Sequence, residues 1–306
     1  MVAGPTASGK STLALALAAD AGGTVINADS LQCYRDLRIL TARPDAVAEA
    51  RAPHRLYGWL DAGRRGSAAE WRVQALAEIA AATAAGRLPI LVGGTGLYLR
   101  ALCQGLAPIP GIPEPVRAEA AALHHALGGA AFRDRLGELD PAGAQRLAPG
   151  DRPRLIRAYE VVRATGVPIG AWRERAHAKP PYRFAVILLM PPREALYAAC
   201  DARFAAMADA GALEEAAALA ARGLDADLPA MKAVGLPELM QHLRGELSLD
   251  AAIAAGQRAT RRYAKRQVTW FRHQVAPDLT LNEQFSESLL RCSRQFIDHR
   301  VLTRRA

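Results

Sequence analysis

Short apolar runs alternate with longer runs of helical periodicity in the first part of the chain. The runs Met1–Ala3, Thr24–Ala28 and Leu88–Val92 have the length and composition of buried strands. A helical run follows the first of them, and Ser67–Glu70 is a capping box that begins a further helix. Strands that alternate with helices predict a parallel, doubly wound α/β sheet, in which ligands bind beyond the carboxyl ends of the strands.

The pattern changes after the Pro-rich stretch Pro108–Pro113, where helices without strands are predicted until Tyr182–Met190 returns to strand character. Ala-rich helices follow, and beyond Asn282 the periodicity is so weak that we expect partial disorder. We therefore expect an α/β core that carries a smaller all-helical insertion domain. The core comprises residues 1–111 and 180–306, and the insertion comprises residues 112–179.

Composition narrows the possible classes of protein. Of 306 residues, 51% are apolar and 23% are charged, which excludes a disordered chain and allows a large core. No apolar run approaches the ~20 residues of a membrane span, and the first residues do not resemble a signal peptide. Four scattered cysteines form no CxxC pair, which favours a reducing compartment. We expect a cytoplasmic monomer with no membrane partner.

The net charge of +9 comes from 39 Lys and Arg against 30 Asp and Glu. Residues 251–306 alone hold eleven Arg or Lys against four Asp or Glu, a net charge of +7. Such a basic region indicates a polyanionic partner. It is also compatible with a solvated surface in a chain whose Arg and Ala excess reflects a GC-rich genome, so charge alone leaves both interpretations open.

The segment Gly4–Ser11 (GPTASGKS) satisfies the phosphate-binding motif G-x-x-x-x-G-K-[ST] between a strand and a helix. Backbone amides and the helix N-terminus donate to an anion, Lys10 adds a positive charge, and Ser11 is placed to hold Mg²⁺. The expected phosphate- or diphosphate-binding residues are Gly4, Pro5, Thr6, Ala7, Ser8, Gly9, Lys10 and Ser11. The motif does not identify the molecule that carries the phosphate.

A nucleoside-triphosphate hydrolase would have an apolar strand that ends in Asp, but the Leu88–Val92 strand ends in Gly-Gly-Thr. The only acid predicted at a strand end near the phosphate loop is Asp29. In a small-molecule kinase Asp29 would activate an acceptor hydroxyl, and in a transferase to nitrogen it would take a proton from an amine. It is also compatible with a simple cap of the next segment.

Basic residues recur at helical spacing near the end of the chain. One stripe consists of Arg258, Arg261, Lys265 and Arg272, and a neighbouring stripe of Arg262, Arg266 and His273. The interleaved Tyr263, Trp270 and Phe271 would supply stacking for an unpaired base, although a solvated helix with a packed aromatic side has the same pattern. A second cluster, Arg152, Arg154 and Arg157, lies in the insertion and favours a nucleic-acid substrate.

Ordered motifs over about residues 2–275 resemble the bacterial tRNA dimethylallyltransferases, also called tRNA isopentenyltransferases. The matching stretches are GPTASGKS at Gly4–Ser11, DSLQCY at Asp29–Tyr34, TARP at Thr41–Pro44, APHRL at Ala52–Leu56, GGTGLYLRAL at Gly93–Leu102, DRPRLIRAYEV at Asp151–Val161, KAVG at Lys232–Gly235 and RRYAKRQVTWFR at Arg261–Arg272. The resemblance implies a P-loop NTPase-like parallel sheet flanked by helices, with a helical insertion domain that contacts tRNA.

The resemblance also implies the reaction: with Mg²⁺, a dimethylallyl group moves from dimethylallyl diphosphate to N6 of the adenine 3′-adjacent to the anticodon, and diphosphate is released. By similarity, Asp29 is the general base, and Thr6, Arg100 and Arg203 stabilise the diphosphate. The residues implied to contact tRNA are Asp29, Ser30, Leu31, Gln32, Thr95, Arg117, Pro153, Arg154, Leu155, Ile156, Arg157, Lys232, Gly235, Arg258, Arg262, Lys265 and Arg266.

Three other functions are weighed against this one. A P-loop small-molecule kinase would consume ATP and leaves the basic C-terminal helix unexplained. A prenyltransferase acting on free adenine nucleotides would need no extended RNA surface. A non-enzymatic RNA-binding module would need neither Asp29 nor the phosphate loop.

Overall fold

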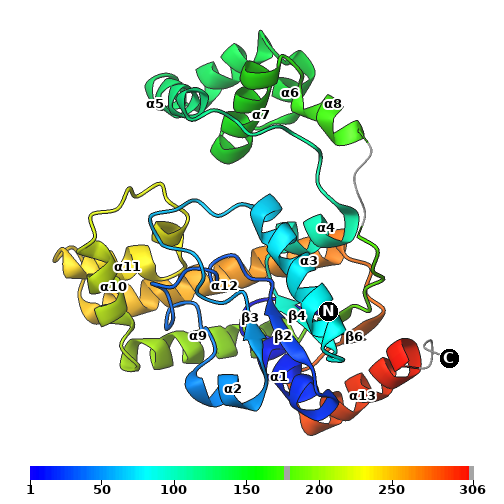
Figure 1. Cartoon of the computed structure of the whole chain (residues 1–306). Coiled ribbons are helices and arrows are strands. Elements are labelled where there is room, and N and C mark those ends of the chain that lie inside the picture. Colours follow the sequence, from blue (N-terminus) through cyan, green and yellow to red (C-terminus); the bar gives the residue numbers. More distant parts are fainter. Residues whose placement is uncertain (176–179, 303–306) are drawn as a thin grey trace. The chain divides into compact units, whose positions relative to one another are not determined.

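The computed structural model describes residues 1–175 and 180–302. The chain forms two compact units (Figure 1). The core unit comprises Met1–Cys103 and Pro180–Ala306, and the helical unit comprises Gln104–Lys179. The Pro-rich stretch therefore belongs to the helical unit, and the chain leaves the core unit before it rather than after it.

The core unit contains a six-stranded sheet in the order β3-β2-β4-β1-β5-β6, and every pair of neighbouring strands is parallel. The strands are β1 (Val2–Ala3), β2 (Thr24–Asn27), β3 (His54–Arg55), β4 (Pro89–Gly93), β5 (Ile187–Leu189) and β6 (Leu279–Leu281). The predicted P-loop NTPase-like α/β fold is confirmed. The short strands β3 and β6 were not predicted, because they have no buried apolar run of their own.

Successive strand side chains enter two separate apolar cores, one on each face of the sheet. The helices of the core unit are α1 (Lys10–Ala21), α2 (Ala46–Arg51), α3 (Ala68–Ala84), α4 (Gly96–Gln104), α9 (Arg193–Asp209), α10 (Ala212–Ala220), α11 (Leu236–Leu243), α12 (Leu249–Gln274) and α13 (Glu287–Ile297). A short 3₁₀ helix lies at Ala230–Lys232 and a short π-helix at Asp298–Leu302. Val2 and Val25 pack with α1 and α13, whereas Ala3 and Ile26 pack with α3, α4 and the helices from α9 to α12.

Helix α3 shows how local sequence and packing agree. Ser67 caps it, because the Ser67 hydroxyl accepts a hydrogen bond from the Glu70 amide at 3.0 Å, as the capping box predicts. Its Trp71 is fully buried, stacks on Tyr98 with ring centroids 4.3 Å apart, and donates its indole N–H to the Asn27 carbonyl at 2.9 Å. The helix is thereby fixed against the end of β2.

The expectation of disorder after Asn282 is wrong for α13. Leu289 and Ile297 of this helix are buried in the same core as Leu13 and Leu17 of α1, and Arg294 forms an ion pair with Asp20. Tertiary contact with α1 therefore stabilises a helix whose own sequence pattern is short. Residues 303–306, to which the same expectation extended, lie outside the described residues.

The helical unit contains α5 (Glu114–Gly137), α6 (Pro141–Arg146), α7 (Arg152–Thr165) and α8 (Ile169–Glu174), and no strand among its described residues. Asp140 and Asp151 cap α6 and α7 by accepting backbone N–H groups, and each of these helices begins with a proline in its first turn. Phe132, Leu155 and Tyr159 are fully buried in its own core.

Candidate active site

The phosphate loop joins β1 to α1 and has the backbone of an anion site. Gly9 has φ +87° and precedes α1, and a Cβ there would lie 2.9 Å from the Phe285 Cβ, so the position requires glycine. Ala7 also has a positive φ of +60°, a conformation that costs an L-residue about 1–2 kcal/mol. The Lys10 Nζ folds back and donates to the Pro5 carbonyl at 3.2 Å.

Two partly buried cations face this loop. Burial lowers the pKa of Lys10 to about 8, and the nearby Asp29 carboxylate opposes part of that shift. Burial also lowers the pKa of Arg203, whose Nη2 donates to the Thr6 hydroxyl while its Nε has no partner among the described residues. The Ser8 hydroxyl is likewise buried and unpartnered. Buried donors with unused hydrogens favour an anionic ligand with several oxygens.

Asp29 follows β2 and is held by the fully buried Asn27. The Asn27 Oδ1 accepts the Asp29 amide at 2.8 Å, and its Nδ2 donates to the Asp29 carbonyl at 2.9 Å. The Asp29 Oδ1 accepts the Leu31 amide at 3.0 Å, which leaves Oδ2 without a hydrogen-bond donor among the described residues. Asn27, which is fully buried, was not predicted from the sequence, although a polar residue at the end of an apolar run and just before a strand-end acid is a usable signal.

One pocket brings three of the predicted catalytic residues together. Thr6, Asp29 and Arg203 line it. Its remaining lining is largely apolar and comprises Leu31, Leu40, Thr41, Phe204, Met207, Val234, Thr260 and Tyr263. Arg100, in contrast, is an exposed residue of α4 that does not line this pocket, so its role at the diphosphate stays a prediction.

The loop after Asp29 uses its side chains in different ways. Leu31 lines the pocket, and the Ser30 amide donates to the Thr95 hydroxyl at 2.9 Å, which joins the turns after β2 and β4. The side-chain Nε2 of Gln32 donates to the carbonyls of residues 41 and 42 at 2.8 and 3.0 Å. The structure therefore gives the Gln32 side chain hydrogen bonds within its own loop, and its implied contact with tRNA stays a prediction.

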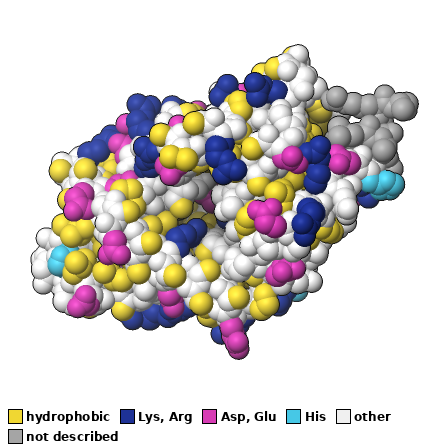
Figure 2. Space-filling model, turned by 90° about the horizontal axis from the view of Figure 1, so that it is seen from below, with side chains coloured by type: hydrophobic (Ala, Val, Ile, Leu, Met, Phe, Trp, Pro, Cys, Tyr) yellow, Lys and Arg dark blue, Asp and Glu magenta, His cyan; other side chains and the backbone are white. Residues whose placement is uncertain are grey.

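Helix α12 presents a row of cations to solvent. Arg258, Arg262 and Lys265 are exposed and have no ion-pair partner among the described residues, and Arg266 has only the Tyr263 ring, at 5.5 Å. Arg261 of the same sequence stripe instead pairs with Asp201 at 2.5 Å. Across the face in Figure 2, Lys and Arg are interleaved with Asp and Glu. The position of cations on α12 is therefore more informative than the total charge.

The three aromatic residues of α12 lie in three different environments. Phe271 is 1% exposed and belongs to the core. The Trp270 ring lies so close to Gly96 that a Cβ at Gly96 would overlap it. Tyr263 lines the pocket, where burial raises the pKa of its phenol and keeps it protonated. Of the three, Tyr263 alone faces the pocket that contains Asp29.

Gln267 on the buried side of α12 connects two loops of the site. Its Oε1 accepts the Thr6 amide at 2.7 Å, and its Nε2 donates to the Gly94 carbonyl at 3.0 Å. Gln267 is not among the residues predicted from the sequence. Its signal is a polar side chain in line with the buried positions of an amphipathic helix, where it is 6% exposed.

The remaining residues implied to contact tRNA have mixed environments. Arg154 pairs with Asp151 at 3.1 Å, Arg157 pairs with Glu160 at 3.2 Å, and Lys232 pairs with Asp227 at 2.8 Å. Buried or partly buried members are Leu155, Ile156, Gly235 and Arg117, and the Arg117 Nε has no partner among the described residues. Pro153 is exposed in the first turn of α7. Direct contact with RNA is therefore easiest for Pro153, Arg154 and Lys232 among these.

A divalent cation fits the site only together with a phosphate ligand. Among the described residues, no group of three or more His, Cys, Asp or Glu is arranged to hold a metal ion. Ser11 offers an exposed hydroxyl beside Lys10 at the start of α1. Mg²⁺ keeps several waters and is often held by few protein groups plus substrate phosphates, so these residues fit a metal that binds with a diphosphate.

None of the helices in the described residues has the length and apolar character of a membrane span.

The sequence model of the family described as "IPP transferase" matches residues 32–274 of this chain. The tRNA dimethylallyltransferase of Rhodospirillum centenum is 63% identical over 278 residues, which cover 90% of this chain and 88% of the relative. The tRNA dimethylallyltransferase of Rhodospirillum rubrum is 55% identical over 296 residues, which cover 95% of this chain and 91% of the relative.

Solved structures give the same result. The full-length tRNA isopentenylpyrophosphate transferase from Bacillus halodurans superposes with a TM-score of 0.70 at 33% identity, covering 97% of this chain and 94% of that one. A eukaryotic dimethylallyltransferase acting on tRNA superposes with a TM-score of 0.81 at 25% identity, covering 96% of this chain and 76% of that one. This chain, which carries its phosphate loop and Asp29 at the same sheet edge, therefore belongs to the IPP transferase family of tRNA dimethylallyltransferases.

Proposed function

We propose that this chain transfers a dimethylallyl group from dimethylallyl diphosphate to N6 of the adenine 3′-adjacent to the anticodon of a tRNA, with release of diphosphate. The observation that carries the proposal is the pocket lined jointly by Asp29, Thr6 and Arg203. It offers a base, donors for a leaving diphosphate and apolar side chains that suit a five-carbon isoprenoid. Family membership argues against a small-molecule kinase.

The phosphate loop and Arg203 would bind the leaving group. Negative charge grows on the diphosphate as the allylic C–O bond breaks, and preorganised donors in a buried site stabilise that charge. The donors are the loop amides, the Lys10 ammonium and the Arg203 guanidinium, whose Nη2 already reaches the Thr6 hydroxyl. Mg²⁺, held by the Ser11 hydroxyl and diphosphate oxygens, would neutralise further charge.

Asp29 would accept the proton that N6 loses when the new C–N bond forms. Its Oδ1 is held by the Leu31 amide, so Oδ2 is the oxygen available for that proton. A positioned carboxylate of this kind typically contributes about 10²–10⁴-fold to the rate. Leu31, Leu40 and Phe204 would exclude water from the reactive allylic carbon.

The exposed cations of α12 would contact tRNA phosphates, and Arg117 and Arg154 of the helical unit would add to them. The target base is stacked in its loop, so it must be extruded into the pocket, which costs a few kcal/mol that phosphate contacts offset. We propose that the enzyme works as a monomer in the cytoplasm, where its tRNA is found.

The test is prenylation of an anticodon stem-loop by the purified chain with Mg²⁺ and dimethylallyl diphosphate. Mass spectrometry should find one added C₅H₈ group on a single adenosine, and none when guanosine replaces that adenosine. AMP serves as the competing acceptor, and ATP turnover is measured in parallel. Prenylation of AMP without prenylation of RNA, or ATP-dependent phosphorylation of a small alcohol, would overturn the proposal.

A further inference from the structure

A carboxylate on α10 holds a loop that forms part of the pocket wall. The Glu215 Oε2 accepts the backbone amides of Arg38 and Ile39 at 2.6 and 2.8 Å, and its Oε1 accepts the Leu40 amide at 2.9 Å. These three successive amides belong to no helix or strand. Because backbone N–H groups need partners, one ionised side chain determines the path of this segment.

The segment leads directly into the pocket. Leu40, which is 7% exposed, and Thr41 both line the pocket that Asp29 also lines. The Thr41 hydroxyl donates to the Leu37 carbonyl at 2.7 Å, and the Gln32 side-chain Nε2 donates to the Thr41 carbonyl at 2.8 Å. The wall is therefore fixed from its own loop on one side and by Glu215 of α10 on the other.

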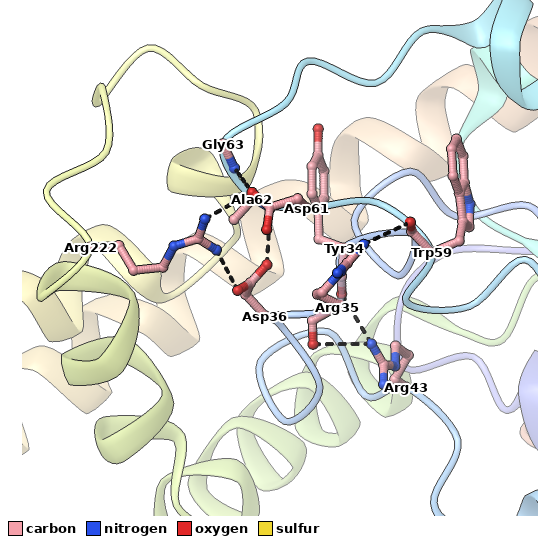
Figure 3. A network of polar contacts seen from close by, with 9 residues as sticks. All are labelled: Tyr34, Arg35, Asp36, Arg43, Trp59, Asp61, Ala62, Gly63 and Arg222. Atoms are coloured by element: carbon pink, nitrogen blue, oxygen red, sulfur yellow. Dashed lines mark hydrogen bonds and ion pairs between the residues drawn. The ribbon is translucent and has the colours of Figure 1, made fainter.

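The far end of α10 is tied to neighbouring loops. Arg222, just after α10, donates to the Asp36 Oδ1 at 2.5 Å and to the Asp61 Oδ1 at 2.8 Å (Figure 3). The Asp36 Oδ2 accepts the Ala62 amide at 2.9 Å. Since α10 is anchored at this end, the Glu215 carboxylate in its first turn is a fixed point for residues 38–40.

We propose that Glu215 is a positioning residue that holds Leu40 and Thr41 in the pocket wall and thereby sets the length of the isoprenoid chain that the site accepts. The inference rests on the proposed prenyl transfer. An apolar pocket discriminates between chain lengths only as far as its wall resists displacement. When residues 38–40 lose their acceptor, Leu40 moves outward and a longer chain fits.

The test compares dimethylallyl diphosphate with the ten-carbon geranyl diphosphate as donors. In Glu215→Gln the side chain keeps its length but loses its charge and turns an NH₂ group toward backbone donors. We expect the ratio of kcat/KM for geranyl over dimethylallyl to rise by about tenfold, mainly through a lower KM for geranyl diphosphate. Leu40→Ala should raise the same ratio without altering the Glu215 contacts.

Glu214→Gln is the matched control, because it removes the same charge from the same helix turn at an exposed side chain. It should keep the wild-type ratio. A ratio unchanged in both Glu215→Gln and Leu40→Ala, or a parallel loss with both donors in Glu215→Gln, would overturn the inference.

Hydrogen exchange of the free protein separates this inference from the proposed reaction. Amides 38–40 should exchange at least tenfold faster in Glu215→Gln than in the wild type and in Glu214→Gln. Equal exchange in all three would show that Glu215 does not hold the loop, whether or not the chain prenylates RNA. A wild-type chain that prenylates no RNA would remove the proposed function, while the exchange result would still decide the contact.

Discussion

The Oε1 of Gln267 accepts the backbone amide of Thr6 at 2.7 Å, which joins the long basic helix α12 to the phosphate loop. Gln267 also donates to the Gly94 carbonyl, so a single buried side chain connects the loops that follow β1 and β4. The helix proposed to bind RNA and the loop proposed to bind diphosphate are therefore joined directly by a hydrogen bond.

Gln267→Glu keeps the acceptor for the Thr6 amide but replaces the donor to Gly94 with a negatively charged oxygen beside the phosphate loop. We expect KM for dimethylallyl diphosphate to rise at least about tenfold, the effect of a lost charge-assisted or buried hydrogen bond, with a smaller change in the Kd for RNA. Steady-state kinetics and filter binding measure the two. Gln274→Glu, at an exposed position of the same helix, should change neither, and an equal response of both variants would contradict the prediction.

Asp29→Ala should slow the chemical step strongly and largely keep RNA binding. Loss of a general base lowers the single-turnover rate by about 10²–10⁴-fold, whereas the phosphate contacts of α12 are untouched. Rapid quench with labelled dimethylallyl diphosphate gives the rate, and fluorescence anisotropy gives the Kd. If RNA affinity falls while the rate of bound complex is normal, Asp29 does not act as the base.

Local sequence pattern was sufficient for the phosphate loop, the four apolar strands and the strand-end position of Asp29. Each of these depends on residues close together in the chain: the glycines and Lys10 of one turn, or a short apolar run before an acid. The confirmed α/β sheet follows from the alternation of such runs with helices.

The local sequence pattern could not predict contacts between residues that are far apart in the chain. Gln267 meets Thr6 across 261 positions and Glu215 meets Arg38 across 177, and nothing local to either side chain identifies its partner. For the same reason a helical stripe could not tell Arg261, which pairs with Asp201, from Arg258 of the same stripe, which faces solvent. The partner of each side chain depends on which elements pack around it, and that is determined only by the assembled fold.

Lys10 predicts a pH dependence of diphosphate binding. Burial lowers its pKa to about 8 from an ordinary value of 10.5, so in the free enzyme the positive charge disappears as the pH rises through about 8. We expect kcat/KM for dimethylallyl diphosphate to fall with a midpoint near pH 8. Lys10→Gln should lack that step and have a raised KM at every pH, and persistence of the step in Lys10→Gln would assign it to another group.

The contribution of Lys10 to the free energy of unfolding has the opposite pH dependence, so unfolding does not explain the expected loss of kcat/KM. A lysine with a lowered folded pKa destabilises the folded chain while it is charged, below pH 8, and that penalty is relieved between pH 8 and 10.5. The Lys10 contribution to the free energy of unfolding therefore grows over the range in which activity falls. Urea titrations at pH 7 and pH 9 of the wild type and Lys10→Gln separate the two effects.

Replacing Arg262 and Lys265 together by alanine should weaken RNA binding and flatten its salt dependence. Each phosphate contact to a single strand contributes about 0.7 to the slope of log K against log salt, so we expect the slope to decrease by about 1.4. The charge-matched control replaces Arg51 and Arg87, two exposed cations on other parts of the core unit. Unchanged affinity in the first variant would return α12 to the interpretation of a solvated surface.

The Phe204 ring, which lines the pocket, contacts the backbone at Gly235 and Gly256. A Cβ at Gly235 or at Gly256 would overlap this ring. Gly256→Ala should therefore push Phe204 toward the pocket, lower the free energy of unfolding by about 1–3 kcal/mol and raise KM for dimethylallyl diphosphate. Urea denaturation and donor kinetics measure the two effects.

A smaller side chain at position 204 tests whether the ring transmits the effect. Phe204→Leu in the Gly256→Ala background should recover part of the stability and of the KM, because the leucine leaves room for the new methyl group. In a double-mutant cycle the two changes should thus couple by about 0.5–3 kcal/mol. Gly170→Ala in α8, where an added Cβ meets nothing within 4 Å, is the glycine control and should leave KM unchanged. If the changes in the free energy of unfolding for Gly256→Ala and Phe204→Leu simply add, the added methyl group at position 256 does not act through the Phe204 ring.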